Sequence, residues 1–159
     1  MKGIYLFSQH QRSGIIMDQH KPYWNRMVPE LTVTNFSLSL DFYQRILGFQ
    51  LLIRRDNPNF AYLALGEAQL MLEARHNDGW NTASLNYPLG RGVNFQIEVD
   101  DLTPLLDNLK ANSIKLYREV KDNHYYVNEV IACQREFLVQ DPDGYLLRFS
   151  QFIENIITY

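Results

Sequence analysis

The sequence predicts an α+β fold built from two tandem βαβββ modules. The first observation is that strand-like, helical and again strand-like patterns follow one another in the same order in both halves of the chain. The second is that the two halves superimpose at an offset of about 66 residues, which pairs Val33 with Val99 and Leu40 with Leu106. A repeated order of elements indicates duplication of one structural unit.

The first module is predicted to span residues 27–76. Period-two alternation in MVPELTV indicates a strand over 28–33. Asn35 suits the N-cap of a helix over 37–47, in which apolar side chains recur at helical spacing, and Gly48 suits its end. Further strands are predicted at 49–55, 60–65 and 68–74, separated by turn residues.

A linker over 77–91, rich in Gly, Asn and Pro, leads to the second module at 92–152. This module repeats the pattern, with a strand at 93–99 and a helix at 103–112 that two aspartates precede. Further strands are predicted at 114–120, 134–140 and 145–152, the last two joined by the type I turn Asp-Pro-Asp-Gly at 141–144. Residues 153–159 are expected to form a short C-terminal tail.

The first 26 residues are polar and weakly patterned, and lack the apolar run of a signal peptide. Residues 1–26 are therefore interpreted as an N-terminal extension or an overlong start, with Met17 and Met27 as alternative starts. The other interpretation is an arm whose Tyr23 and Trp24 dock on a partner subunit.

Charge and composition exclude several kinds of partner and site. The formal net charge of −3 argues against nucleic acid or an anionic membrane as the main partner. No run of about 18 apolar residues is present to span a membrane. Cys133 is the single cysteine, which rules out an internal disulfide and a cysteine-rich zinc site and fits a reducing, cytoplasmic location.

Three stretches carry a resemblance to a known superfamily: VPELTVTNFSLSLDFYQRILGF, GRGVNFQIEVDDL and REFLVQDPDGYLLRFSQ. Together they resemble, over residues 28–151, the vicinal oxygen chelate superfamily of glyoxalases, extradiol dioxygenases, fosfomycin-resistance enzymes and bleomycin-resistance proteins. The resemblance is greatest to the bleomycin-resistance proteins. It implies the glyoxalase/bleomycin-resistance fold, in which the two modules form a curved, cup-shaped sheet.

Enzymes of this superfamily hold a divalent metal in the cup, with His or Gln on the first strand of each module and Glu on the last. The corresponding positions here are Val28, Met71, Asn94 and Arg148. Valine, methionine and arginine are poor ligands for hard divalent ions, and arginine would repel a cation. The histidines show no H-x-H or H-x₃-H spacing, and no motif for covalent catalysis occurs. We therefore expect no metal, no cofactor and no catalytic residue.

Because side chains alternate along a strand, the inner face of the cup follows from those four positions. It adds Glu30, Thr32, Gln69, Glu73, Gln96, Glu98, Leu146 and Ser150. Three carboxylates then face one arginine, so the cup should be acidic and favour a cationic ligand. Arg148 is expected to pair with a glutamate, either to fill the space of the absent metal or to line a ligand site, and these two roles are compatible.

In the bleomycin-resistance proteins that this chain resembles, the drug is held at a dimer interface by stacking aromatic rings and acidic groups. Phe60 falls where the family has a stacking Phe, whereas the two stacking Trp positions correspond to Gln96 and Cys133. Candidates to replace the missing rings are Tyr62, Trp80, Tyr125 and Tyr126. The predicted ligand-binding residues are Glu30, Thr32, Phe60, Tyr62, Glu73, Asn94, Gln96, Glu98, Cys133 and Arg148.

The favoured function is therefore a metal-independent, cytoplasmic protein that sequesters a cationic aromatic compound, such as a bleomycin-like molecule. A homodimer is expected, and Pro29 lies where the N-terminal strand could hinge to exchange between subunits. The alternative is a metal-dependent lyase or isomerase of the glyoxalase type, or a dioxygenase, with displaced ligands. A third class is a dimer retained to bind a protein partner.

Overall fold

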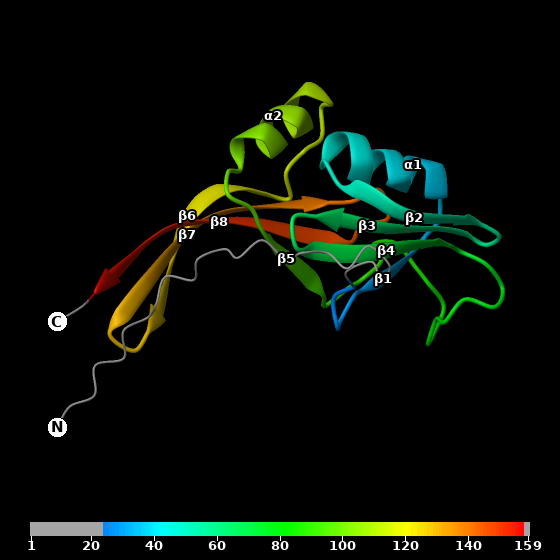
Figure 1. Ribbon diagram of the computed structural model, residues 1–159, viewed down its shortest axis with the longest axis horizontal. Helices are drawn as coiled ribbons and strands as arrows, with labels where there is room; N and C mark the ends of the chain where they lie inside the picture. The colour runs from blue at the N-terminus through cyan, green and yellow to red at the C-terminus, as the bar shows by residue number, and fades with distance from the viewer. Residues whose placement is uncertain (1–23, 158–159) are drawn as a thin grey trace.

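The computed structural model describes residues 24–157, in which both helices lie on the same side of the strands (Figure 1). The first module contains β1 (Glu30–Val33), α1 (Phe36–Asp41), the π-helical segment η1 (Phe42–Ile46), β2 (Gln50–Asp56), β3 (Asn59–Leu65) and β4 (Ala68–Ala74). The second contains β5 (Asn94–Glu98), α2 (Thr103–Ala111), β6 (Arg118–Val127), β7 (Val130–Gln140) and β8 (Leu146–Ile157). This order confirms the α+β class and the two successive βαβββ modules.

Each module folds into one four-stranded sheet. Sheet one has the order β1-β4-β3-β2 and sheet two the order β5-β8-β7-β6. The first and last strands of each module are parallel neighbours, so that Glu30 lies beside Met71 in sheet one and Gln96 beside Arg148 in sheet two. The side chains that sequence analysis assigned to the cup therefore come from adjacent strands.

The helical segment of the first module begins as predicted and changes its pitch before it ends. The Asn35 side chain accepts a hydrogen bond of 3.1 Å from the backbone N–H of Leu38, which confirms the N-cap. After Asp41 the α-helix widens into η1, in which the backbone N–H of Leu47 donates to the carbonyl of Phe42 at 3.0 Å. The predicted apolar stripe is nevertheless buried along both segments: Phe36, Leu40, Tyr43 and Leu47.

One apolar core lies between the sheets and the helices. The alternating apolar residues of the strands belong to this core: Leu31, Val33, Leu70, Leu72, Ile97, Leu147 and Phe149 are buried, with Phe95 and Val99 packed against them. Their alternates point to the other side of each sheet, because successive side chains of a strand point to opposite faces. We call this side, away from the helices, the open face.

The turn between β7 and β8 ties the second module to the first. The N–H of Gly144 donates to the carbonyl of Asp141 at 3.0 Å, as expected for the predicted turn. Asp143 accepts hydrogen bonds from the backbone N–H and the hydroxyl of Thr34, the latter at 2.5 Å. Asp141 accepts one from the Tyr43 hydroxyl at 3.1 Å. Two buried carboxylates of one module thus hold the helix and strand end of the other.

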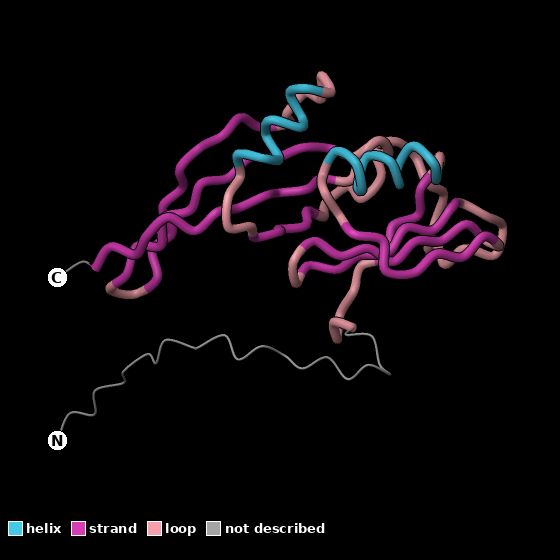
Figure 2. Tube along the Cα trace, turned by 45° about the horizontal axis from the view of Figure 1, so that its top comes forward, coloured by secondary structure: helices cyan, strands magenta, loops and turns pink. Residues whose placement is uncertain are grey.

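Sheet two extends well beyond the predicted strands and forms a projecting three-stranded arm (Figures 1 and 2). The strand predicted at 114–120 is wrong in its first half, because Ile114 and Leu116 pack against the core outside the sheet and β6 begins at Arg118. Strand β7 begins at Val130 instead of 134, and β8 continues to Ile157 instead of ending at 152. Both sides of the arm expose large apolar side chains, among them Tyr126, Val127 and Ile157, so burial alternation could not reveal these strands.

Two predicted features lie partly or wholly outside the described residues. Tyr23 of the proposed N-terminal arm is not described, whereas Trp24 packs edge to face on Tyr62 with 4.7 Å between the ring centroids. In the described part of the chain, no helix has the length and apolar character needed to cross a membrane.

Candidate functional site

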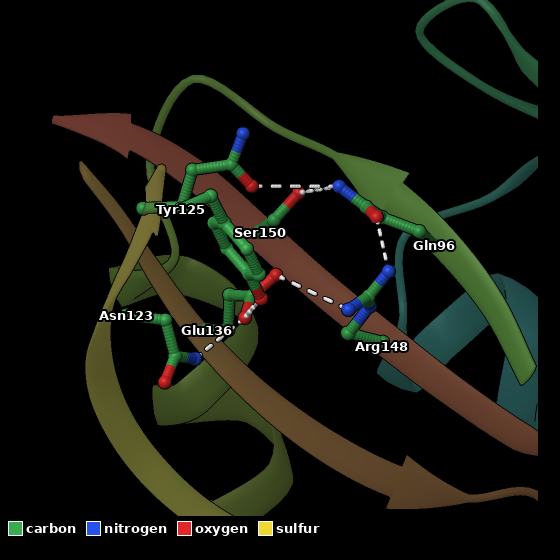
Figure 3. A network of polar contacts seen from close by, with 7 residues as sticks. Gln96, Asn123, Tyr125, Glu136, Arg148 and Ser150 are labelled. Atoms are coloured by element: carbon green, nitrogen blue, oxygen red, sulfur yellow. Dashed lines mark hydrogen bonds and ion pairs between the residues drawn. The ribbon is translucent and has the colours of Figure 1, made fainter. Parts of the chain in front are cut away.

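Arg148 is the centre of a polar network on the open face of sheet two (Figure 3). It lies on β8 beside Gln96 of β5, and its guanidinium donates a hydrogen bond to the side-chain oxygen of Gln96. The amide nitrogen of Gln96 in turn lies 3.3 Å from the hydroxyl of Ser150 and 3.4 Å from the side-chain oxygen of Gln134. The side-chain amide of Gln96 is therefore held by Arg148 at its oxygen and by Ser150 and Gln134 at its nitrogen.

Glu136 of β7 is the carboxylate partner of Arg148. Its side chain is only 3% exposed, and its Oε1 lies 3.7 Å from the guanidinium nitrogen Nη1. Its Oε2 accepts hydrogen bonds from Asn123 at 2.6 Å and from the hydroxyl of Tyr125 at 2.7 Å, both from β6. This hydrogen bond raises the pKa of Tyr125, because only the neutral phenol can donate it, and partial burial and the charge of Glu136 add to the rise.

Sequence reasoning expected an ion pair for Arg148 but considered only the glutamates of the first and last strands. Glu136 was missed because it belongs to the third strand of its module. The signal was present, since Phe137 and Val139 alternate with Glu136 and Leu138 along REFLVQ and are fully buried. This alternation predicts that the side chain of Glu136 lies on the open face, opposite to the buried Phe137 and Val139.

This network borders a cavity of about 510 Å³, which lies within the range of small-molecule sites. Its lining residues come from all four strands of sheet two and from the segment before β6: Asn94, Tyr117, Arg118, Glu119, Lys121, Asn123, Tyr125, Glu136, Leu138, Leu146 and Arg148. We call it the sheet-two cavity. It contains two of the predicted ligand-binding residues, Asn94 and Arg148.

A second group of predicted residues gathers on the open face of sheet one. Strand pairing places Thr32, Glu73 and Phe60 in one row, and Glu30, Met71 and Tyr62 in the next. The guanidinium of Arg55 lies over the ring of Phe60, 4.0 Å from its centroid. The face of Phe60 is thus covered by a cation of the protein itself.

The two carboxylates of this group lie near one another. Partial burial and the neighbouring charge of Glu73 raise the pKa of Glu30, although Arg55 and His76 oppose that rise. Glu73 also lies 3.1 Å from Nε2 of His76. Sheet one therefore combines aromatic rings with a small acidic cluster, as the predicted preference for a cationic aromatic ligand requires.

Two further predicted residues, Glu98 and Cys133, belong to neither group. Glu98 is exposed on the edge strand β5, beside Ser150. Cys133 is buried beside His124 and Glu154, on the side of β7 opposite to Glu136. A second cavity of about 510 Å³ does bring the modules together, and it is lined by Val28 and Asn94 among others.

The four positions at which the superfamily's enzymes bind metal do not fit a cation. Met71 lies between Glu30 and Tyr62 on sheet one, and the guanidinium of Arg148 is already bound to Gln96 and Glu136. Within residues 24–157, no three His, Cys, Asp or Glu side chains converge so that they could hold a metal ion. The arrangement offers hydrogen bonds and charge for binding, whereas Phe60 and Tyr62 are only 5% and 2% exposed and their rings are contacted by Arg55 and Trp24.

Comparison with known proteins places these observations in a family. Residues 25–149 match the family model described as the Glyoxalase/Bleomycin resistance protein/Dioxygenase superfamily. A lactoylglutathione lyase of Neisseria meningitidis is 35% identical over 128 residues, which cover 76% of this chain and 86% of that protein. A bleomycin resistance protein of Geobacillus stearothermophilus is 29% identical over 136 residues, covering 80% of this chain and 97% of that protein.

Among solved structures, TioX from Micromonospora sp. ML1 has a similar fold, with a TM-score of 0.63 at 21% identity over 82% of this chain and 100% of that one. Fold, sequence motifs and family model thus agree over most of the chain. The chain belongs to the glyoxalase/bleomycin resistance protein/dioxygenase superfamily.

Proposed function

We propose that this chain is a metal-independent, cytoplasmic small-molecule-binding protein of the bleomycin-resistance type. The observation that carries the proposal is Arg148, which occupies a metal-ligand position of the related enzymes with its guanidinium bound to Gln96 and Glu136. A permanent positive charge at that point opposes a divalent cation. The similarity to a bleomycin resistance protein supports the same class.

The ligand that fits sheet one is aromatic and cationic. The guanidinium of Arg55 on the ring of Phe60 marks a surface on which a planar cation is stable. Glu30 and Glu73 supply negative charge within the same two rows of side chains. A ligand that displaced Arg55 from Phe60 would gain both interactions.

Titration with bleomycin tests this proposal, with Trp24 as the reporter. The chain contains two tryptophans. Trp24 packs on Tyr62 at the open face of sheet one, whereas Trp80 is 94% exposed. In a Trp80→Phe background, we expect a saturable change in fluorescence with a Kd below ~100 μM, about −5.5 kcal/mol.

Two charge-neutral variants locate the binding. Glu30→Gln should weaken bleomycin binding about tenfold, or about 1.4 kcal/mol, because it removes one of the two acidic groups. Glu67→Gln, in the exposed turn after β3, is the matched control and should bind like the parent. The absence of saturable binding, or an equal loss in both variants, would refute a bleomycin-type ligand on sheet one.

A metal-dependent lyase or isomerase is the second candidate. It is favoured by the 35% identity to a lactoylglutathione lyase, which exceeds the identity to the bleomycin resistance protein. Elemental analysis of protein purified without chelator separates the two candidates. Stoichiometric Zn, Ni, Mn or Fe would replace our proposal with the enzyme, and metal far below one equivalent would support binding alone.

We also propose a homodimer, since the drug-binding proteins that the sequence resembles form their site between subunits. Light scattering during gel filtration of the full chain tests this and should give twice the monomer mass of 18.7 kDa. Truncation to Met27 tests whether the N-terminal extension contributes, as an arm or as a contact for another protein. A monomeric full-length chain would contradict the proposal.

A further inference from the structure

A β-bulge in β6 places two cations on the open face of sheet two. Arg118 pairs with Leu138, whereas Lys121, three residues later, pairs with Glu136, only two residues earlier on β7. Leu138 and Glu136 share a face, so their partners Arg118 and Lys121 share it as well. Without the extra residue, these two side chains would point to opposite sides of the sheet.

Arg148 adds a third cation to the same cavity. Arg148 of β8 pairs with Leu138 of β7, which in turn pairs with Arg118 of β6. The three residues therefore form one row across the strands. Leu138 separates Arg118 from Arg148 in this row, and Lys121 lies opposite Glu136. Three cations thus line one cavity, and their charge favours an anionic group there.

The carboxylates of the cavity compensate this charge only in part. Glu136 is engaged by Arg148, Asn123 and Tyr125. Glu119, within the bulge, is the only other carboxylate among the lining residues. The side chains of Arg118 and Lys121 form no ion pair or hydrogen bond with any residue of the range 24–157.

The cavity also contains a donor that lacks an acceptor. Nε of Arg148 is buried and makes no hydrogen bond within the described part of the chain. A buried donor without a partner is costly, because it has lost its hydrogen bonds to water. Oε1 of Glu136, which lines the same cavity, is likewise buried without a hydrogen bond. An acceptor in the cavity would remove the cost at Nε only if the Arg148 guanidinium turned toward it.

We propose that the sheet-two cavity binds the anionic group of a small molecule, a carboxylate or a phosphate, between Arg118, Lys121 and Arg148. Guanidinium and ammonium groups recognise both anions through charge-assisted hydrogen bonds. Asn94 and Tyr117 line the same cavity and offer further donors. This site does not depend on the cationic aromatic ligand proposed for sheet one, since it lies on the other sheet and has the opposite charge preference.

Nuclear magnetic resonance titration of the full-length protein tests the site. Sodium phosphate and sodium acetate are titrated separately into ¹⁵N-labelled protein, with ionic strength held constant by sodium chloride. We expect saturable shifts for the amides of β6 and for the Nε–H of Arg148 with at least one of the two anions. The anion that saturates at lower concentration identifies the preferred group.

Charge-neutral variants provide the control. Arg118→Gln and Lys121→Gln should each raise the half-saturation concentration at least fivefold, whereas Lys110→Gln, in the last turn of α2, should leave it unchanged. All three residues are exposed, so the variants should retain the dispersed spectrum of the folded protein. Shifts that stay linear with both anions, or saturation that Arg118→Gln and Lys121→Gln do not affect, would overturn the proposal. Bleomycin binding at Trp24 would be unaffected by either result.

Discussion

Two arginine–carboxylate pairs on sheet two show how burial decides the value of an ion pair. Arg135 and Asp122 lie on the exposed side of the arm at 2.7 and 2.8 Å, with about half of each side chain exposed. Arg148 and Glu136 lie farther apart, at 3.7 Å, but Glu136 is 3% exposed. Water screens the attraction between Arg135 and Asp122, so this pair adds little stability. Arg148 instead provides an ion-pair partner for the buried carboxylate of Glu136, and the loss of such a partner is costly.

Arg148→Met should therefore destabilise the protein much more than Arg135→Met. We expect a loss of about 3 kcal/mol for Arg148→Met, since the buried Glu136 side chain loses its ion-pair partner. Arg135→Met should cost less than about 1 kcal/mol, as exposed pairs do. Urea unfolding of both variants measures the difference.

The double variant Arg148→Met/Glu136→Gln isolates the cause of that loss. Removing the buried charge together with its partner should restore part of the lost stability, because Gln can still interact with Asn123 and Tyr125. Equal urea midpoints for Arg148→Met and Arg135→Met would contradict the structural role of the buried pair.

At the scale of single residues, the sequence was informative where alternation was strict. It assigned Arg148, Gln96 and Asn94 to one face, and strand pairing places all three on the open face of sheet two. It did not include Lys121, because the face was derived from the first and last strands of each module and the strand predicted at 114–120 ended before this residue. The bulge in β6 also breaks the alternation on which such an assignment depends. Cross-strand neighbours are set by register, which no single strand pattern contains.

At the scale of elements, burial determined which segments could be predicted. The helix and strands of the first module were recognised because apolar and polar side chains alternate between core and open face. The arm was not recognised, because most side chains of residues 121–127 in β6 are exposed on both sides of the sheet. The widening of the helix into η1 was also missed, since the apolar stripe is buried in either geometry.

The arm depends on its hairpin turn, in which Asn128 adopts a left-handed conformation with φ of 55°. Asparagine and glycine tolerate this region, whereas alanine is strained there. Asn128→Ala should cost about 1 kcal/mol locally, and Asn128→Gly should be close to neutral. Because the arm projects from the core, we expect the loss as faster hydrogen exchange at Val127 and Val130.

The global urea midpoint serves as the control for this variant. It should change little, since local opening of the arm does not require the core to unfold. Equal exchange rates in Asn128→Ala and Asn128→Gly would show that the conformation of this residue does not limit the arm.

At the scale of the whole molecule, the two modules share one core and a cluster of buried polar contacts. Asp141 and Asp143 of the second module, 4% and 3% exposed, bind Tyr43 and Thr34 of the first. Sequence analysis identified this turn by its glycine and proline but assigned no role to its carboxylates. Their role depends on the packing of one module against the other, which a repeated local pattern does not specify.

The buried carboxyl of Asp141 should make this contact sensitive to pH. Burial, with a further contribution from Asp143, raises the pKa of Asp141 from 3.8 to about 6, although hydrogen bonds from Tyr145 and Tyr43 oppose the rise. A folded pKa above the unfolded value means that the native state holds the proton more tightly. The stability this proton provides is fully present below pH 3.8 and is lost as the pH rises through 6.

Asp141→Asn should remove this dependence, since an amide keeps the acceptor for the N–H of Tyr145 and carries no charge. A rise in pKa from 3.8 to about 6 corresponds to about 3 kcal/mol, of which about 2 kcal/mol is lost between pH 4 and pH 7. The free energy of unfolding of Asp141→Asn relative to the parent should therefore increase by about 2 kcal/mol over that interval. Urea unfolding at pH 4, 5, 6 and 7 measures it, and comparison with the parent cancels the titration of all other carboxylates. A difference that stays constant with pH would mean that Asp141 is ionised in the folded protein throughout, and that the contact between the modules tolerates a buried negative charge.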